Sequence, residues 1–148
     1  MGTKGNYIFR YKGVYYIFYN HFDSYMTGLG ADIVKELRSW TAEDFENARA
    51  FLDNFPNEAT DKGDDSFKGL METLRTPQAF CLVDINTSGP SLYTDAEYWY
   101  TLDFDRNHFV VQWIEYSADD NIKTLTQRFR LTDIPEDWID LTGATKEH

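Results

Sequence analysis

The fold is decided by residues 98–114, which read Tyr98-Trp99-Tyr100-Thr101-Leu102-Asp103-Phe104-Asp105-Arg106-Asn107-His108-Phe109-Val110-Val111-Gln112-Trp113-Ile114. Two series of alternating side chains flank a polar run at 105–107, and this alternation predicts two antiparallel strands joined by a turn. The turn imitates the start of a calcium-binding loop. However, His108 stands at the sixth position, where Gly is needed, and Ile114 stands at the twelfth, where Glu is needed. A hairpin explains the stretch better.

More strands are predicted on both sides of this hairpin. Alternation at 125–131, with Arg128 and Arg130 on the polar side, predicts a third strand of a meander. Near the start of the chain, runs rich in Ile, Tyr, Phe and Val at 6–11 and 14–20 flank Lys12-Gly13 and predict another hairpin, with both faces of its second strand partly covered. The apolar run at 80–85 predicts a central strand covered on both sides.

The middle of the chain has helical patterns. Apolar spacing predicts a first helix through Ile33, Val34, Leu37 and Trp40. Thr41-Ala42-Glu43-Asp44 resembles a capping box that begins a second helix, which Pro56 ends. Weaker patterns predict a short third helix at 67–74 and a terminal helix at 133–139, with Trp138 and Ile139 as its anchors. The polar, acidic stretch at 57–65 predicts a mobile surface loop.

The order of strands, then helices, then strands indicates an α+β fold. We expect a single domain over residues 1–148, because 148 residues fit one domain. Its sheet is expected to be largely antiparallel, built from the N-terminal hairpin and the C-terminal meander. Two to three helices are expected to pack on one face of that sheet.

Composition excludes several classes of protein. The formal net charge is −11, from 14 basic and 25 acidic side chains, which opposes nucleic-acid binding. No stretch approaches the roughly 20 apolar residues of a membrane span. Cys81 is the only cysteine, so an intrachain disulfide is excluded. We therefore expect a soluble cytoplasmic protein without a nucleic-acid or membrane partner and without a cofactor, and the sequence leaves its oligomeric state open.

The candidate functional stretch is the loop that follows the first hairpin, Tyr19-Asn20-His21-Phe22-Asp23-Ser24-Tyr25-Met26-Thr27-Gly28-Leu29-Gly30. Its density of polar side chains is typical of functional loops. The chain before residue 39 is also locally basic. We expect this loop to bind a small polar or anionic ligand or a protein partner, through Lys4, Arg10, Asn20, His21, Asp23, Ser24, Tyr25, Gly28 and Gly30.

Other interpretations of the loop stay open. His21 as a general base with Asp23 as its orienting acid would suit a hydrolase or transferase. The same two residues are too few to hold a metal ion, so no metal site is predicted. Gly28-Leu29-Gly30 could present free backbone amides to an anion, although glycines before a helix are usually turns. In the structural interpretation, Asp23 and Ser24 only bridge the turn into the helix.

The motifs also resemble those of an uncharacterised family of small fungal and viral proteins. Members of that family open with Met-Gly-Thr-Arg-Gly and carry Tyr-Asn-His-(Phe/Trp)-Asp-Ser-Tyr-Pro followed by Gly-Leu-Gly. This chain opens with Met1-Gly2-Thr3-Lys4-Gly5 and departs from the pattern at Lys4 and Met26. The stretches at 97–105 and 134–139 are similar as well. The resemblance implies a shared site but assigns no activity to it.

Overall fold

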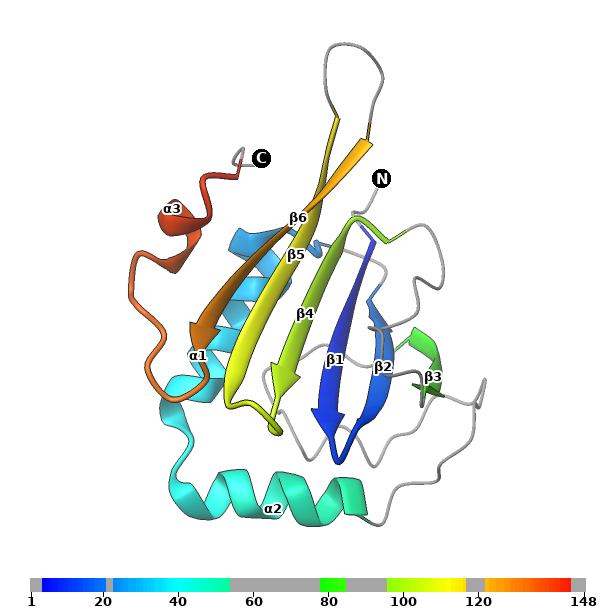
Figure 1. Ribbon diagram of the computed structural model, residues 1–148, viewed down its shortest axis with the longest axis vertical. Helices are drawn as coiled ribbons and strands as arrows, with labels where there is room; N and C mark the ends of the chain where they lie inside the picture. The colour runs from blue at the N-terminus through cyan, green and yellow to red at the C-terminus, as the bar shows by residue number, and fades with distance from the viewer. Residues whose placement is uncertain (1–3, 21–22, 54–77, 85–95, 117–121, 145–148) are drawn as a thin grey trace.

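The computed structural model describes residues 4–20, 23–53, 78–84, 96–116 and 122–144. They form a six-stranded sheet in the order β3-β2-β1-β4-β5-β6 (Figure 1). The strands are β1 (Gly5–Tyr11), β2 (Val14–Asn20), β3 (Gln78–Asp84), β4 (Tyr98–Asp103), β5 (His108–Tyr116) and β6 (Ile122–Arg130). A π-helical turn, η1 (Met26–Gly30), leads into α1 (Ala31–Ser39), and α2 (Ala42–Asp53) and α3 (Trp138–Thr142) complete the described elements. The predicted α+β class is confirmed.

Both predicted hairpins are present. β4 pairs antiparallel with β5, so that Asp103 lies opposite His108, and β5 pairs antiparallel with β6 over nine residue pairs. β1 pairs antiparallel with β2 across the turn at Lys12-Gly13, where both residues have positive φ angles of 52° and 75°. Glycine adopts such angles without cost, which explains its place in this tight turn.

Two features of the sheet were not predicted. β1 joins the two halves of the sheet by pairing parallel with β4, a pairing that the hairpins did not specify, and the sheet is otherwise antiparallel, as the expected largely antiparallel sheet requires. β3 was predicted as a central strand and instead lies at the edge of the sheet, next to β2. An apolar run indicates that both faces of a strand are covered, but it does not indicate whether both edges are paired. The prediction of a central position was wrong because it inferred edge pairing from face coverage.

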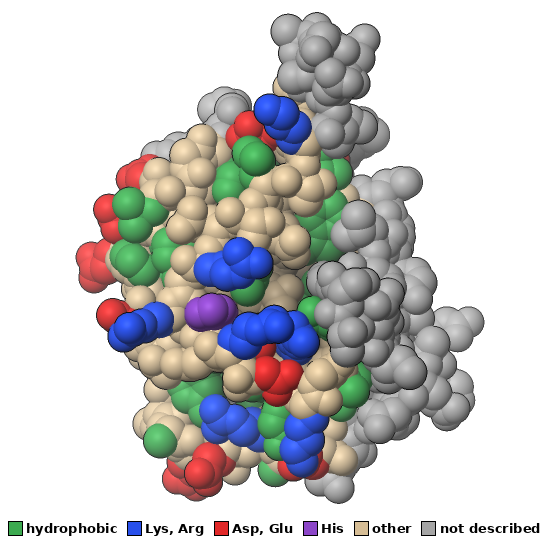
Figure 2. All heavy atoms as spheres, viewed as in Figure 1, with side chains coloured by type: hydrophobic (Ala, Val, Ile, Leu, Met, Phe, Trp, Pro, Cys, Tyr) green, Lys and Arg blue, Asp and Glu red, His purple; other side chains and the backbone are tan. Residues whose placement is uncertain are grey.

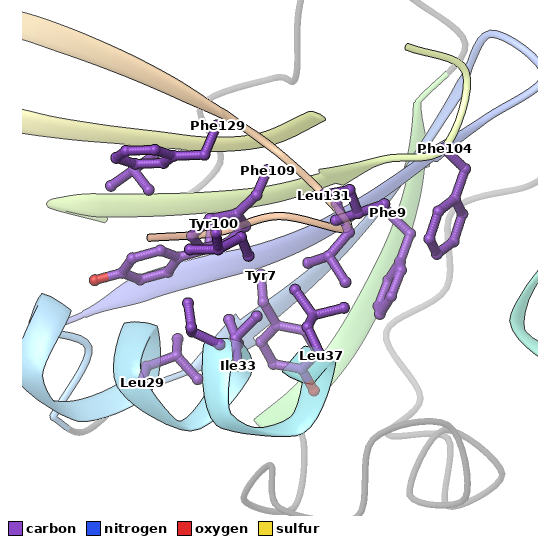
Figure 3. Close-up of a cluster of buried hydrophobic side chains, with 14 of the residues drawn as sticks. Tyr7, Phe9, Leu29, Ile33, Leu37, Tyr100, Phe104, Phe109, Phe129 and Leu131 are labelled. Carbon is purple, nitrogen blue, oxygen red and sulfur yellow. The ribbon is translucent and has the colours of Figure 1, made fainter. Parts of the chain in front are cut away.

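One face of the sheet packs against the helices. Leu29, Ile33 and Leu37 point from the η1–α1 segment toward strand residues such as Tyr7 and Tyr100 (Figure 3). α2 adds Phe45, Ala48 and Leu52 to the same cluster. The predicted capping box is confirmed, because the Thr41 amide donates to the Asp44 carboxylate at 2.7 Å and the Asp44 amide donates to the Thr41 hydroxyl at 3.3 Å.

The terminal helix begins later than expected, at Trp138 instead of 133. The segment before it is held in another conformation, because the Arg38 guanidinium donates to the carbonyl oxygens of Ile134 at 3.3 Å and Pro135 at 2.9 Å. Trp138 is buried, as expected of an anchor, and Ile139 packs partly against the core. The helix predicted at 67–74 and the loop predicted at 57–65 lie outside the described residues.

The second face of the sheet is buried only in part. Ile8, Tyr15, Ile17, Ala96 and Trp99 form a smaller apolar cluster on the β2, β1 and β4 side. Toward β5 and β6, the same face carries half-buried or exposed side chains. The expectation that both faces of β2 are covered is confirmed, since Tyr15, Tyr16, Ile17 and Phe18 are all buried.

Candidate functional site

The structure describes the predicted loop only in part. Asn20 ends β2, and His21 lies outside the described residues, so the predicted pair of His21 and Asp23 stays a prediction. Asp23 is exposed and has a φ angle of 53°, a left-handed conformation that Asp tolerates better than most residues do. Ser24 is fully buried and Tyr25 is half-buried, with its ring against that of Tyr98.

The backbone amides of Gly28-Leu29-Gly30 are not free for an anion. The amides of Gly28 and Gly30 donate to the Tyr25 carbonyl at 2.9 and 3.3 Å, and the Leu29 amide donates to the Asp23 carbonyl at 2.9 Å. These bonds close the π-helical turn that leads into α1. The alternative that these residues form a turn is therefore confirmed, and the turn itself takes up the donors that could have met an anion.

The glycines of the motif are contact points. A Cβ atom at Gly28 would overlap the carbonyl oxygen of Asp23, and one at Gly30 would lie 2.9 Å from ring atoms of Trp138 and Tyr100. A Cβ atom at Gly5, on β1, would lie 2.6 Å from the Cβ atom of Ser24. The motif residues at 5, 24, 28 and 30 thus hold the loop against the sheet and α3.

Tyr100 fixes the loop from the sheet. Its hydroxyl donates to the Ser24 carbonyl at 2.6 Å. Burial, with a smaller contribution from Tyr98, raises the pKa of Tyr100 well above its ordinary value. The phenol is therefore a hydrogen-bond donor throughout the physiological pH range.

The two predicted basic residues are placed differently, since Lys4 is the neighbour of Gly5, which packs against Ser24, whereas Arg10 lies away from the described part of the loop. The Lys4 carbonyl accepts the Glu97 amide at 2.9 Å, on the β4 side of β1. Arg10 lies at the far end of β1 on the second face of the sheet, where its Nη1 donates to the Tyr15 hydroxyl at 3.0 Å. Its guanidinium carbon lies 4.9 Å from the centre of the Tyr15 ring. Arg10 thus belongs to a different region from Asp23 to Gly30.

Arg10 is the first member of a charged row across the sheet. Strand pairing sets Arg10 beside Asp103, Asp103 beside His108, and His108 beside Arg130. Paired residues of neighbouring strands point to the same face, so the row crosses β1, β4, β5 and β6 on the face opposite α1. The adjacent row on β6 brings Arg128 to the same face.

The two carboxylates of this region are occupied by the turns. Asp103 Oδ1 accepts the amides of Asp105 and Arg106, both at 3.0 Å, and its Oδ2 lies 3.5 Å from Arg106 Nη1. Asp105 accepts the amides of Lys12 and Gly13 at 2.7 and 2.9 Å and lies 3.6 Å from Arg10 Nε. These bonds tie the two hairpin turns together.

Four basic side chains form what we call the arginine–histidine cluster: Arg106, His108, Arg128 and Arg130. The arginines are exposed, and His108 is half-buried. Within the described part of the chain, neither Arg128 nor Arg130 has a side-chain ion pair or hydrogen bond. Figure 2 shows Lys and Arg side chains gathered around a histidine on the face of the molecule that the sheet presents in Figure 1.

Sequence reasoning placed Arg128 and Arg130 on the polar side of their strand but did not select them as site residues. The sequence did contain a signal, because the polar side of the predicted strand at 125–131 carries two arginines and the preceding predicted strand begins next to His108. It became visible only with the register, since the turn between β5 and β6 sets which residues lie opposite each other.

A cavity of about 370 Å³ lies beside the end of α1. Its apolar lining includes Leu37, Phe45 and Leu131, and Trp40 lies on the same wall with its ring 5.1 Å from that of Phe45. The arginine that lines it, Arg38, is bound to the carbonyls of Ile134 and Pro135. The cavity thus lies between α1, α2 and the segment after β6, where Thr132 and Asp133 add polar groups to its apolar lining.

Searches for a metal site, for membrane helices and for similar proteins assign no function to the chain. Within the described residues, no group of three His, Cys, Asp or Glu side chains is arranged to hold a metal ion. None of the helices described is long and apolar enough to cross a membrane. No protein-family model, curated protein or solved structure matches the chain.

Proposed function

We propose that this protein is a binding domain that takes an anionic ligand, or an acidic partner, on the arginine–histidine cluster of β5 and β6. The observation that carries the proposal is the pair of exposed arginines, Arg128 and Arg130, that form no side-chain ion pair with any described residue of a chain with a net charge of −11. Lys12 and Arg106, two other exposed cations, each have a carboxylate partner, Asp53 and Asp103. A local group of unpaired arginines is suited to bind anions from solution.

The position of the cluster supports binding at a preformed surface. Its members project from two hydrogen-bonded strands and a turn that Asp103 holds by two amide bonds. Groups fixed by the backbone lose little entropy when a ligand binds. Arginine is also enriched at protein interfaces, and Tyr116, at the other end of β5, is 68% exposed.

The loop at 20–30 is the alternative binding site for the same kind of ligand. One observation favours it: Asp23 is exposed at a positive φ angle, and such residues gather at functional sites. The enzymatic alternative, with His21 as base and Asp23 as orienting acid, would also operate there. Against this placement, Ser24 is buried and the amides of Gly28, Leu29 and Gly30 are already bonded.

The experiment is a binding titration with poly-L-glutamate, a flexible polyanion, followed by fluorescence of the tryptophans and by calorimetry at low salt. We expect the wild-type protein to bind and the Arg128→Gln/Arg130→Gln double variant to lose most of that affinity. Each lost charged contact should cost about tenfold. Salt should weaken the binding, because exposed charges are screened within about 10 Å at 0.1 M ionic strength.

Lys123→Gln is the matched control, since Lys123 is an exposed cation of the same strand that points to the opposite face. It should leave the affinity within about twofold of wild type. Loss of binding in His21→Ala or Asp23→Ala, with normal binding in the double arginine variant, would move the site to the loop. Equal losses in Lys123→Gln and the double variant would show general charge attraction and overturn the proposal.

A further inference from the structure

The charge of the arginine–histidine cluster limits the ligand it can take. The region contains four arginines, Arg10, Arg106, Arg128 and Arg130, and three described carboxylates, Asp103, Asp105 and Asp133. Arg10 and Arg106 lie next to Asp105 and Asp103, at 3.6 and 3.5 Å. Arg128 and Arg130 form no ion pair with any described residue, and neither does Asp133, whose backbone bridges that of Arg130. Two guanidinium groups can neutralise a ligand with two negative charges, and a ligand with a single charge uses only half of that capacity.

The strand geometry places the free groups around a single point. Arg128 and Arg130 are two residues apart on β6, which separates their Cα atoms by about 7 Å on the same face. His108 lies directly opposite Arg130, at about 5 Å between Cβ atoms. Two long guanidinium groups and an imidazole on such a triangle converge on an anion with several oxygens. Planar guanidinium forks suit oxyanions of this kind.

His108 contributes a donor position beside this point. Its Nδ1 atom is buried and has no hydrogen-bond partner among the residues that the structure describes, and the residue as a whole is half-buried. The other ring nitrogen is therefore the one that can meet a ligand from the open side of the sheet. An N–H group at Nε2 of the imidazole can donate a hydrogen bond to a bound oxyanion.

We infer that the cluster binds the dianion of a phosphate monoester, with Arg128 and Arg130 as the two principal contacts and His108 as the third. The inference rests on the proposed function and names its ligand class. A phosphate monoester has a second pKa of about 6, so it is mainly a dianion at pH 7.5, and it offers three acceptor oxygens. The monoester is either a small phosphorylated metabolite or a phosphorylated side chain of a protein.

The test compares phenyl phosphate with phenyl sulfate at pH 7.5, with backbone amide shifts of β5 and β6 as the readout. The two probes have nearly the same shape and the same three terminal oxygens, but phenyl sulfate carries only one negative charge. We expect phenyl phosphate to bind at least tenfold more tightly, and Arg128→Gln and Arg130→Gln each to weaken it about tenfold or more. His108→Gln should weaken it less, and Lys123→Gln should leave it unchanged.

A peptide with one phosphotyrosine between neutral residues separates the two sources of the monoester. Affinity equal to that of phenyl phosphate supports a small metabolite, and clearly tighter binding supports a phosphorylated protein. Equal binding of phenyl phosphate and phenyl sulfate, or an equal loss in Lys123→Gln, overturns the inference. If poly-L-glutamate binds through Arg128 and Arg130 while phenyl phosphate does not, the proposed function stands and the phosphate assignment fails. If neither binds, both fail.

Discussion

At the scale of single residues, the conspicuous loop motif is explained first by packing. Gly28 lets the chain pass over the carbonyl of Asp23, Gly30 lets α1 approach Trp138 and Tyr100, and Gly5 leaves room for Ser24. A glycine forced by close contact is a structural requirement whether or not a ligand binds nearby. The glycines of this loop are therefore explained by the packing of the fold, and they are no evidence for a ligand site.

Gly28→Ala tests this explanation. The added methyl group would overlap a backbone oxygen that accepts the Leu29 amide, so the turn must open. We expect a loss of about 2 kcal/mol or more in the free energy of unfolding, measured by urea denaturation. Thr27→Ala, at an exposed neighbour in the same turn, should change it by less than about 0.5 kcal/mol. Similar losses in both variants would contradict the packing role of Gly28.

Thr101 makes a prediction of the opposite sign. It lies on the second face of the sheet, is 4% exposed, and its hydroxyl has no hydrogen-bond partner in the described part of the chain. Burying such a group without a partner costs free energy, and Val has the same shape without the hydroxyl. We expect Thr101→Val to raise the free energy of unfolding by about 1 kcal/mol. Thr101→Ser keeps the hydroxyl and should not raise it. Destabilisation by Val would mean that the hydroxyl is bonded.

At the scale of elements, the sequence predicts the helices and hairpins whose conformation depends on residues close together in the chain. Side-chain alternation predicts the hairpin at 98–114, and helical spacing with Thr41 and Asp44 predicts α2. The parallel pairing of β1 with β4 depends on contacts between residues far apart in the chain, and no local pattern encodes it. Arg10 joins the row only through that pairing, whereas Asp103, His108 and Arg130 meet through the register of β4, β5 and β6. A row of this kind is invisible before the register is known.

The start of α2 illustrates the local kind of information. Thr41 and Asp44 satisfy one another's backbone amides, and this exchange fixes where the helix begins. We expect Thr41→Ala to lower the free energy of unfolding by about 1 kcal/mol. Thr41→Ser, which keeps the capping oxygen, should restore most of it. Circular dichroism during urea denaturation measures both variants. An unchanged stability in Thr41→Ala would mean that the packing of Phe45, Ala48 and Leu52 alone sets the helix.

At the scale of the whole molecule, one charge distribution gives two salt effects of opposite sign. The net charge of −11 makes the folded chain repel itself, and salt screens that repulsion. We therefore expect the free energy of unfolding to rise when NaCl increases from about 20 to about 200 mM, measured with urea because guanidinium is itself a salt. Anion binding at Arg128 and Arg130 should weaken over the same range, because there the screened interaction is an attraction.

The Arg128→Gln/Arg130→Gln variant connects the two effects. Removing both cations makes the protein more acidic, so its stability should depend more steeply on salt than that of the wild type. The anion binding that salt weakens should be absent from the same variant. Lys123→Gln also removes a cation and should steepen the salt dependence of stability by a smaller amount, while it preserves binding. Lys123 and the two arginines face opposite sides of the sheet. If Lys123→Gln abolished binding as the double variant does, the anion would therefore be attracted by the overall charge of the protein and not by the arginine–histidine cluster.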